Sequence, residues 1–542
     1  PWDMYAMSNY NSITSLAESP LAEGLLYAGT DDGLIHVSQD NGGSWRSLEV
    51  GSLPGVPKRA FVNDIRADLH DPDTVYVALD NHKYGDFSPY LLVSKNRGRS
   101  WKMITDGIPE KHLVWRLVQD HIRPDLMFAA TEFGVFATFD AGAAWHKLSG
   151  GMPTISLRDI QIQRRENDLV AASFGRGFYV LDDYSALRDI NPEDFEVDAA
   201  LFKPRDADWY FPKRPLGYRP KGSQGDSLFV ADNPAFGAVF TYYLSTSLET
   251  REQARQRSEA EALESGKSVS FPGWDTVTEE SREEEPDVML TIKDLQGNVL
   301  RRVPAVNQSG LNRVAWDLRR SFEGPVEMGN NWRGDPPTGF MVMPGTYTAQ
   351  LIALHNGQER VLTEPVSFDV KPLRAGALPG GSLEELEAFT SELSDLYGKS
   401  SAVRYAIRDA REELDKLATM LERMQQPLAA GSSRIFALRA ELFDIEEIVF
   451  GNELQSGIGG YEPMSVSSWL GHAVRGVSNS SYGPTPSHRQ SVAHARSVFE
   501  PALARLNRLL QKDLHLLKSD LRNAGAPWTV GEPIVVSAEA AN

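Results

Sequence analysis

The sequence predicts a mainly β, multidomain protein that ends in α-helices. Three observations predict this class: repeated strand patterns in the first third, alternating apolar segments in the middle, and helically spaced apolar residues after residue 382. The chain has 542 residues, which is long enough for three or four domains. Hydrophobic residues make up 41% of the chain, and they supply the apolar surface that several packed cores need.

An octapeptide with the pattern Ser/Thr-x-Asp/Asn-x-Gly-x-x-Trp occurs three times in the first third of the chain. It reads SQDNGGSW over 38–45, SKNRGRSW over 94–101 and TFDAGAAW over 138–145. Each copy follows a pair of apolar, strand-like segments, and a fourth such pair at 168–183 lacks the octapeptide. These repeats predict β-propeller blades over 1–190, about four in number and part of a larger propeller.

The residues of the octapeptide have a mechanical explanation. An Asp or Asn side chain accepts backbone N–H groups across a tight turn, Gly adopts a positive φ, and Trp packs between neighbouring sheets. We therefore expect structural turns, not acid chemistry, at Asp40, Gly42, Trp45, Asn96, Gly98, Trp101, Asp140, Gly142 and Trp145.

The octapeptide resembles the Asp-box, or BNR repeat, of sialidases, sortilin-type receptors and xyloglucanases. The first 190 residues, with the order of domains behind them, resemble sortilin-like exported bacterial proteins that are described as glycosyl hydrolase-like. The resemblance implies a propeller and an extracytoplasmic location, either periplasmic or secreted. It also implies further blades, supplied by an upstream segment or by a second chain. Because the same repeat serves enzymes and receptors, it implies no single activity.

Three regions are expected after the blades in the sequence. Residues 191–222, rich in Pro, Arg and aromatic residues, predict an ordered connector. Alternating strand-like segments over 223–373 predict an immunoglobulin- or fibronectin-like β-sandwich, interrupted by a charged helical insertion at 249–285. From Ser382 onward, three helical seams of apolar residues predict a helical bundle over 382–530, with a Gly/Ser/Pro-rich loop at 451–487.

The loops between the second and third strands of each blade are expected on the propeller face opposite the octapeptide turns. The loop at 79–86 is longer than its counterparts, and long loops on a rigid scaffold often bind ligands. His82 beside Lys83 suits an anion or a proton transfer, while packing on a neighbouring domain through Tyr84 is the alternative. The ligand-binding candidates of this face are Asp31, Asp32, Asn81, His82, Lys83, Tyr84 and Arg176.

The first strand of each blade is expected to line the central channel. Alignment of the blades places Asp64, Arg116 and Arg158 at corresponding positions. The two guanidinium groups would then bind a carboxylate or sulfate. The alternative is that these arginines pair with Asp64, Asp120 or Asp159 and join the blades together.

Three functions remain open. The leading hypothesis is an exported ligand-binding or scaffold propeller that recognises a glycan or an extended peptide on its loop face. The second is a glycoside hydrolase with Asp64 and Glu132 as catalytic carboxyls, since such hydrolysis needs two carboxyls about 5–10 Å apart. The third is a structural piece of a larger assembly.

Composition argues against several other classes. A net charge of −19 disfavours nucleic acid as a partner. No apolar run approaches the roughly 20 residues of a membrane-spanning helix, so no membrane insertion is expected. The chain contains no cysteine, which excludes disulfides and thiolate metal sites. The sequence contains no HExxH or P-loop pattern, and we expect neither a metal nor a cofactor.

Overall fold

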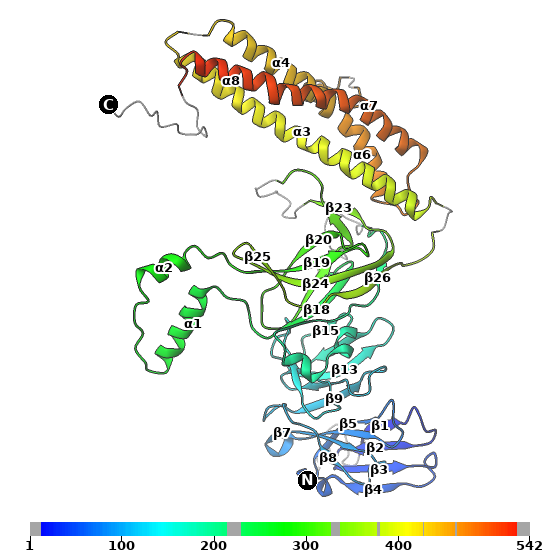
Figure 1. Ribbon diagram of the computed structural model, residues 1–542. Helices are drawn as coiled ribbons and strands as arrows, with labels where there is room; N and C mark the ends of the chain where they lie inside the picture. The colour runs from blue at the N-terminus through cyan, green and yellow to red at the C-terminus, as the bar shows by residue number, and fades with distance from the viewer. Residues whose placement is uncertain are drawn as a thin grey trace.

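The computed structural model describes residues 12–213, 229–326, 337–376, 380–426, 428–460 and 463–527. Small β-sheets form one end of an elongated molecule, larger sheets form its middle, and long helices form the other end (Figure 1). Residues 214–222 of the expected connector, 223–228 and 327–336 of the expected sandwich, and 528–530 of the expected bundle lie outside the described residues. Among the helices of the described ranges, none combines the length and the apolar character needed to cross a lipid bilayer.

Residues 12–181, the first part of the chain that the structure describes, form four small antiparallel sheets, in which each strand pairs with the next strand along the chain. We call them blades 1 to 4. Blade 1 consists of β1 (Ile13–Glu18), β2 (Leu26–Thr30), β3 (Leu34–Ser38) and β4 (Arg46–Glu49). Blade 2 consists of β5 (Phe61–Ala67), β6 (Val75–Asn81), β7 (Asp86–Ser94) and β8 (Lys102–Met103). Blade 3 consists of β9 (Val114–Gln119), β10 (Met127–Thr131), β11 (Gly134–Thr138) and β12 (His146–Leu148). Blade 4 has three described strands, β13 (Leu157–Gln163), β14 (Asp168–Ser173) and β15 (Phe178–Leu181).

The blades stack face to face around their first strands, as in a β-propeller. The first strands β1, β5, β9 and β13 contact one another in that order. A separate apolar core fills each space between successive blades, and Tyr27, Phe136 and Phe128 are among the fully buried residues of the three cores. Because each sheet is apolar on both faces, a blade is stable only between neighbours.

The middle region contains two sheets that share one core. The smaller sheet has the order β16 (Ala199–Leu201), β18 (Ala238–Leu244) and β21 (Gly310–Trp316). The larger sheet contains β17 (Ala207–Trp209), β26 (Val366–Pro372), β24 (Gly345–His355), β19 (Asp287–Lys293), β20 (Val299–Ala305) and β25 (Gln358–Val361). A two-stranded sheet pairs β22 (Arg319–Ser321) with β23 (Thr338–Met341). The buried residues Phe240, Trp316 and Phe368 lie in edge-to-face contacts that join the smaller sheet to the larger one.

Two helices stand away from these sheets as an arm (Figure 1). The arm comprises residues 249–285, with α1 (Arg251–Glu264) and α2 (Trp274–Glu280). No residue of α1 is buried, so this helix does not derive its stability from an apolar core.

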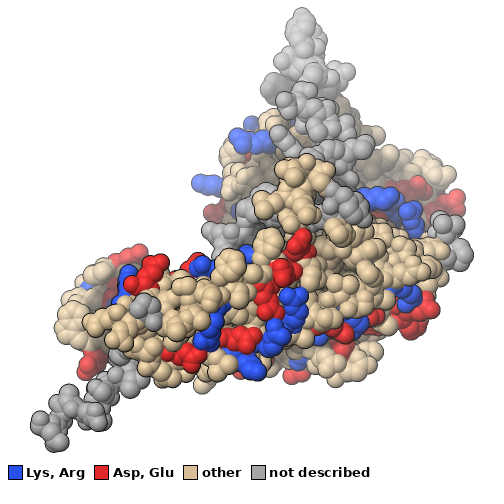
Figure 2. All heavy atoms as spheres, turned by 90° about the horizontal axis from the view of Figure 1, so that it is seen from above, with Lys and Arg blue, Asp and Glu red and all other residues tan. Residues whose placement is uncertain are grey.

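The helical region packs directly on the sheets. It consists of α3 (Leu383–Arg423), α4 (Gly431–Phe450), α5 (Glu453–Gly457), α6 (Val466–Val477), α7 (Pro486–Arg508) and α8 (Leu514–Asn523). The core of the sheets continues into the bundle through Leu386 and Phe389 of α3. The expected loop at 451–487 is partly wrong, because α6 lies within it and buries Val466, Leu470, Ala473 and Val477. Acidic and basic side chains alternate on the surface that the bundle turns to the viewer in Figure 2, as expected for a solvated face.

Candidate functional site

The strand pairing shows which loops lie at which end of the blades. Phe61 pairs with Asp80, Val114 with Thr131, and Leu157 with Ser173. The first strands therefore begin beside the loops that join second and third strands, and we call this end the loop face. The octapeptides follow the far ends of the third strands and lie on the opposite face.

All three octapeptides form the same hydrogen-bonded turn. The Asp or Asn side chain accepts the backbone N–H four residues later, from Ser44 at 2.8 Å, Ser100 at 2.9 Å and Ala144 at 3.0 Å. The Gly adopts a positive φ of 85°, 74° and 90° at Gly42, Gly98 and Gly142. Hydrogen bonds from Ser44 lower the pKa of Asp40, which keeps this carboxylate ionised and engaged in its own turn.

The tryptophans of the three turns differ in burial. Trp145 of blade 3 is 3% exposed, packs against the core shared with blade 2, and donates Nε1–H to the Ile104 carbonyl at 2.8 Å. Trp101 of blade 2 packs against the core shared with blade 1. Trp45 of blade 1 is 44% exposed. Trp101 and Trp145 thus face the preceding blade, whereas among the described residues no blade precedes blade 1 and Trp45.

A β-bulge interrupts the first strand of every blade at the same level. The extra residues are Thr14, Asn63, Trp115 and Arg158. In blades 1 and 2 the bulge residue reaches the next blade: Thr14 Oγ1 donates to the Val62 carbonyl at 2.7 Å, and Asn63 Nδ2 to the Val114 carbonyl at 3.1 Å. A bulge changes the direction in which its extra residue points, so the side chains of these four residues depart from the alternation of their strands.

The bulges correct the expected alignment of the channel residues. Asp64 pairs with Ala78, Arg116 with Ala130, and Asp159 with Ala172. Asp159 is therefore the counterpart of Asp64 and Arg116, and the expectation that Arg158 corresponds to them is wrong by one residue. Because side chains alternate along a strand, a shift of one residue changes the direction in which the side chain points.

Asp64 and Arg116 are engaged with each other. Asp64 Oδ1 accepts Arg116 Nη1 at 3.0 Å, while Oδ2 accepts Arg66 Nε at 2.9 Å and the Leu117 amide at 3.1 Å. Burial raises the pKa of Asp64, and the two arginines oppose that shift. These contacts join blades 2 and 3. The side chains of Asp64, Arg66, Arg116 and Asp159 also line a hollow of about 550 Å³ along the first strands.

Blades 2, 3 and 4 meet in a polar and aromatic cluster at the loop face. The loop-face cluster consists of Asp80, His82, Trp115, Glu132, Ser156 and Arg158. Glu132 Oε2 accepts Trp115 Nε1–H at 2.9 Å and the Ser156 hydroxyl at 2.9 Å. The Arg158 guanidinium lies 3.7 Å from the centre of the Trp115 ring and 3.9 Å from Glu132 Oε2. The structure thus brings Glu132 and Arg158 together from adjacent blades, and it places Asp64 in a separate ion-paired group.

His82 approaches the same tryptophan from blade 2. Its ring lies edge-on to Trp115 at 5.8 Å, and its Nδ1 contacts the buried Asp80 carboxylate. A carboxylate at Nδ1 orients the imidazole and leaves Nε2 as the available nitrogen. Asp80 Oδ2 has no hydrogen-bond partner among the described residues.

Exposed aromatic rings lie on the same loop face as the loop-face cluster. Tyr84 is 64% exposed, Phe174 is 71% exposed, and Phe133 is also exposed. These three residues, which we call the rim aromatics, lie on the loops between second and third strands of blades 2, 4 and 3. Phe174 lies 5.1 Å from the Arg158 guanidinium, which connects the rim to the cluster.

The remaining candidates lie on the same loops with more local contacts. Asp31 accepts the Ser12 amide at 2.9 Å, and Asp32 accepts the Thr30 hydroxyl at 2.5 Å, so both bind within blade 1. Asn81 donates to Asp86 at 3.2 Å, and Lys83 lies 4.9 Å from the Phe61 ring. Arg176 is exposed.

Reasoning from sequence left Ser156 and Phe174 out of the candidate set. The sequence carries no local signal for this set, because a one-residue bulge and the angle between blades are non-local properties. Within the described ranges, no group of three or more His, Asp or Glu side chains is placed to hold a metal ion.

Comparisons with known proteins add little to these observations. No protein-family model matches the chain, and no curated protein sequence matches it. Among solved structures, YCF48 from Cyanidioschyzon merolae is 14% identical at a TM-score of 0.25, covering 32% of this chain and 54% of that one. The GH74 xyloglucanase from Xanthomonas campestris is 15% identical at 0.27, covering 44% and 37%. The extracellular domain of BT3049 from B. thetaiotaomicron is 12% identical at 0.26, covering 66% and 38%. The match to YCF48 thus spans about half the length of that protein.

Proposed function

We propose that this protein is an exported, ligand-binding β-propeller protein that recognises a glycan or an extended peptide on its loop face. The observation that supports the proposal is the loop-face cluster, in which three blades contribute to one group around Trp115. The octapeptide turns use their polar groups internally, whereas the loop face presents exposed aromatic and polar groups together.

A glycan fits this surface better than a peptide. Sugar rings have apolar faces that stack on aromatic rings, and the rim aromatics supply such rings on three neighbouring loops. Sugar hydroxyls need fixed acceptors and donors at the ring edge. Glu132 provides an acceptor, because its contacts with Trp115, Ser156 and Arg158 all reach Oε2 and leave Oε1 available. His82 Nε2 provides a second polar group.

A glycan array and a peptide pull-down with the full chain test this function. We expect binding to a restricted set of glycans, reduced at least tenfold by Phe174→Ala or Tyr84→Ala, because exposed aromatic anchors dominate binding energy. The matched control is Trp45→Ala, which removes a half-exposed aromatic from the opposite face. Absence of any binding in both assays would contradict the proposal.

A glycoside hydrolase remains the alternative, and the available Oε1 of Glu132 is the feature that favours it. The same hypothesis is weakened at Asp64, because both oxygens of that carboxylate are occupied by arginines and a backbone amide. Hydrolysis of a polysaccharide panel by the wild-type chain, abolished in Glu132→Gln with binding retained, would establish this alternative.

We also propose that the ring of blades continues beyond blade 1, through an upstream segment or a second chain. The half-exposed Trp45 supports this, since its counterparts in blades 2 and 3 pack against a preceding blade. The outer face of blade 4 supports it too, because Phe178 and Val180 are exposed there. Native mass spectrometry tests this proposal: a stable monomer with a closed ring in solution would contradict it.

Three further assignments belong with this function. The octapeptide turns support membership of the BNR-repeat, sortilin-like exported proteins, and export follows from that membership. The two sheets of the middle region, which follow the blades in the chain, are consistent with an immunoglobulin- or fibronectin-like sandwich that supports the propeller. Detection of the chain in a periplasmic or secreted fraction tests the location.

A further inference from the structure

The arm at residues 249–285 lies outside the functions described above. It projects from the middle sheets, and none of the residues of α1 is buried (Figure 1). The sequence alone favours a solvated insertion for such a charged segment. Solvation accounts for the charges of the arm, but it does not account for its exposed apolar side chains.

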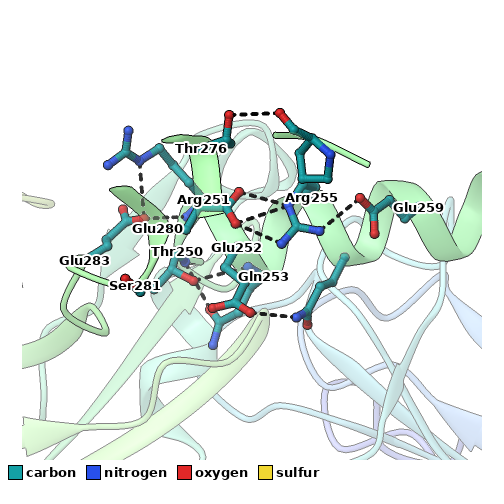
Figure 3. A network of polar contacts seen from close by, with 12 residues as sticks. Thr250, Arg251, Glu252, Gln253, Arg255, Glu259, Thr276, Glu280, Ser281 and Glu283 are labelled. Carbon is teal, nitrogen blue, oxygen red and sulfur yellow. Dashed lines mark hydrogen bonds and ion pairs between the residues drawn. The ribbon is translucent and has the colours of Figure 1, made fainter. Parts of the chain in front are cut away.

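A network of ion pairs holds the two helices of the arm together (Figure 3). Arg255 binds Glu280 through Nε at 2.9 Å and Nη2 at 2.8 Å, and it binds Glu259 at 2.9 Å. A capping box between Thr250 and Gln253 fixes the first turn of α1. The arm is therefore a defined structure and not a loose linker.

A second group of contacts fixes the base of the arm. The Arg251 amide donates to Glu283 at 2.8 Å, and the Glu284 amide donates to Asn356 in the turn after β24 at 2.8 Å. Side chains on such a preorganised support lose little conformational entropy when they bind a partner.

Two exposed aromatic rings pair with each other where α2 of the arm begins. Phe271 is 62% exposed and Trp274 is 76% exposed, and their rings contact each other edge-on at 5.1 Å. Leu263 and Val269 are exposed beside them in the sequence. We call Phe271 and Trp274 the arm patch. Trp and Phe held in this way on a projecting support are typical anchors of protein–protein interfaces.

The charge around the arm patch indicates the chemistry of its partner. The arm contains eleven acidic and five basic side chains. An acidic surface is repelled by anionic lipid and attracted by basic groups. We propose that the arm patch binds a separate protein, through a segment of that protein with apolar anchors flanked by Lys and Arg. The occupant is thus a basic, amphipathic polypeptide segment.

Selection from a phage library of random 16-residue peptides on the full chain tests this proposal, with counter-selection on a Phe271→Ala/Trp274→Ala variant. We expect enriched peptides with two or three apolar anchors among Lys and Arg residues. Their affinity should fall at least tenfold on Trp274→Ala and further at high salt, since the rim is electrostatic. Glu261→Lys/Glu264→Lys should weaken the same peptides without touching the aromatic anchors.

Leu295→Ala is the matched control, because Leu295 is an equally exposed apolar residue on the turn between β19 and β20. It should leave peptide affinity unchanged, and circular dichroism should be identical for all variants. Four results would overturn the proposal: no enrichment, equal binding to the double variant, Trp274-dependent self-association in sedimentation, or Trp274-dependent binding to phosphatidylglycerol/phosphatidylcholine vesicles. The third result would assign the arm patch to a second copy, and the fourth to a membrane.

Discussion

The three octapeptide tryptophans predict a graded loss of stability on truncation to alanine. A tryptophan buries roughly 200 Å² when fully enclosed, which is worth about 4–5 kcal/mol at ~25 cal/mol per Å². Trp145 is 3% exposed and also satisfies the Ile104 carbonyl, so Trp145→Ala should cost about 5 kcal/mol. Trp45 is 44% exposed, and Trp45→Ala should cost about 2–3 kcal/mol.

Hydrogen exchange of the full chain in increasing urea measures this difference, because peptides from β1 to β12 report on blades 1, 2 and 3 separately from the bundle. We expect Trp145→Ala to lower the opening free energy of blades 2 and 3 about twice as much as Trp45→Ala lowers that of blade 1. Trp101→Ala should fall between them. An equal cost at Trp45 and Trp145 would refute the reasoning, since it would mean that Trp45 packs as fully as its counterparts.

Two other predictions concern stability. Asp120 is fully buried and accepts Arg188 at 2.8–3.0 Å, Tyr184 at 2.6 Å, and the amides of Ile122 and Arg123. Burial alone would raise the pKa of Asp120, but the hydrogen bonds outweigh it and lower that pKa. Because the folded pKa lies below the unfolded value of about 3.9, the stabilisation is complete above that pH and is lost as the pH falls through the folded pKa. Asp120→Asn should therefore cost about 3–5 kcal/mol at pH 7 in urea titrations, and the gap to wild type should narrow below about pH 4; a gap independent of pH would contradict this. Leu470→Ala in α6 should cost about 2–5 kcal/mol in thermal unfolding, because Leu470 is fully buried, and a neutral effect would show that α6 does not contribute to the core.

Local features of the fold could be predicted from the sequence. The octapeptide turns depend on side chains that bind backbone groups within four residues. All residues that form such a turn are therefore visible in one short stretch of the sequence. The seam of α3 is similarly local, because its apolar residues repeat over a helix of 41 residues.

Helix α6 was predicted as a loop, although its buried residues follow helical spacing. Val466, Leu470, Ala473 and Val477 recur at intervals of four, three and four residues. The surrounding Gly, Ser and Pro residues favour a loop, and the tertiary contacts of α6 with α3 and α7 outweigh that local preference.

The composition of the loop-face cluster could be predicted only in part. His82 was a candidate because of its long loop, Glu132 as a catalytic carboxyl, and Arg158 as a first-strand residue expected to line the channel. Their meeting around Trp115 depends on a bulge in each first strand and on the angle between blades, which are non-local properties. A single sequence does not mark a one-residue bulge by any strong local preference.

Hydrogen exchange with and without an array-selected glycan tests most directly which face of the blades binds. We predict protection of residues 79–84, 113–116, 130–134, 156–158 and 173–176, which contribute the loop-face cluster and the rim aromatics. Protection confined to the octapeptide turns at 38–45, 94–101 and 138–145 would contradict the account, because it would place the ligand on the opposite face.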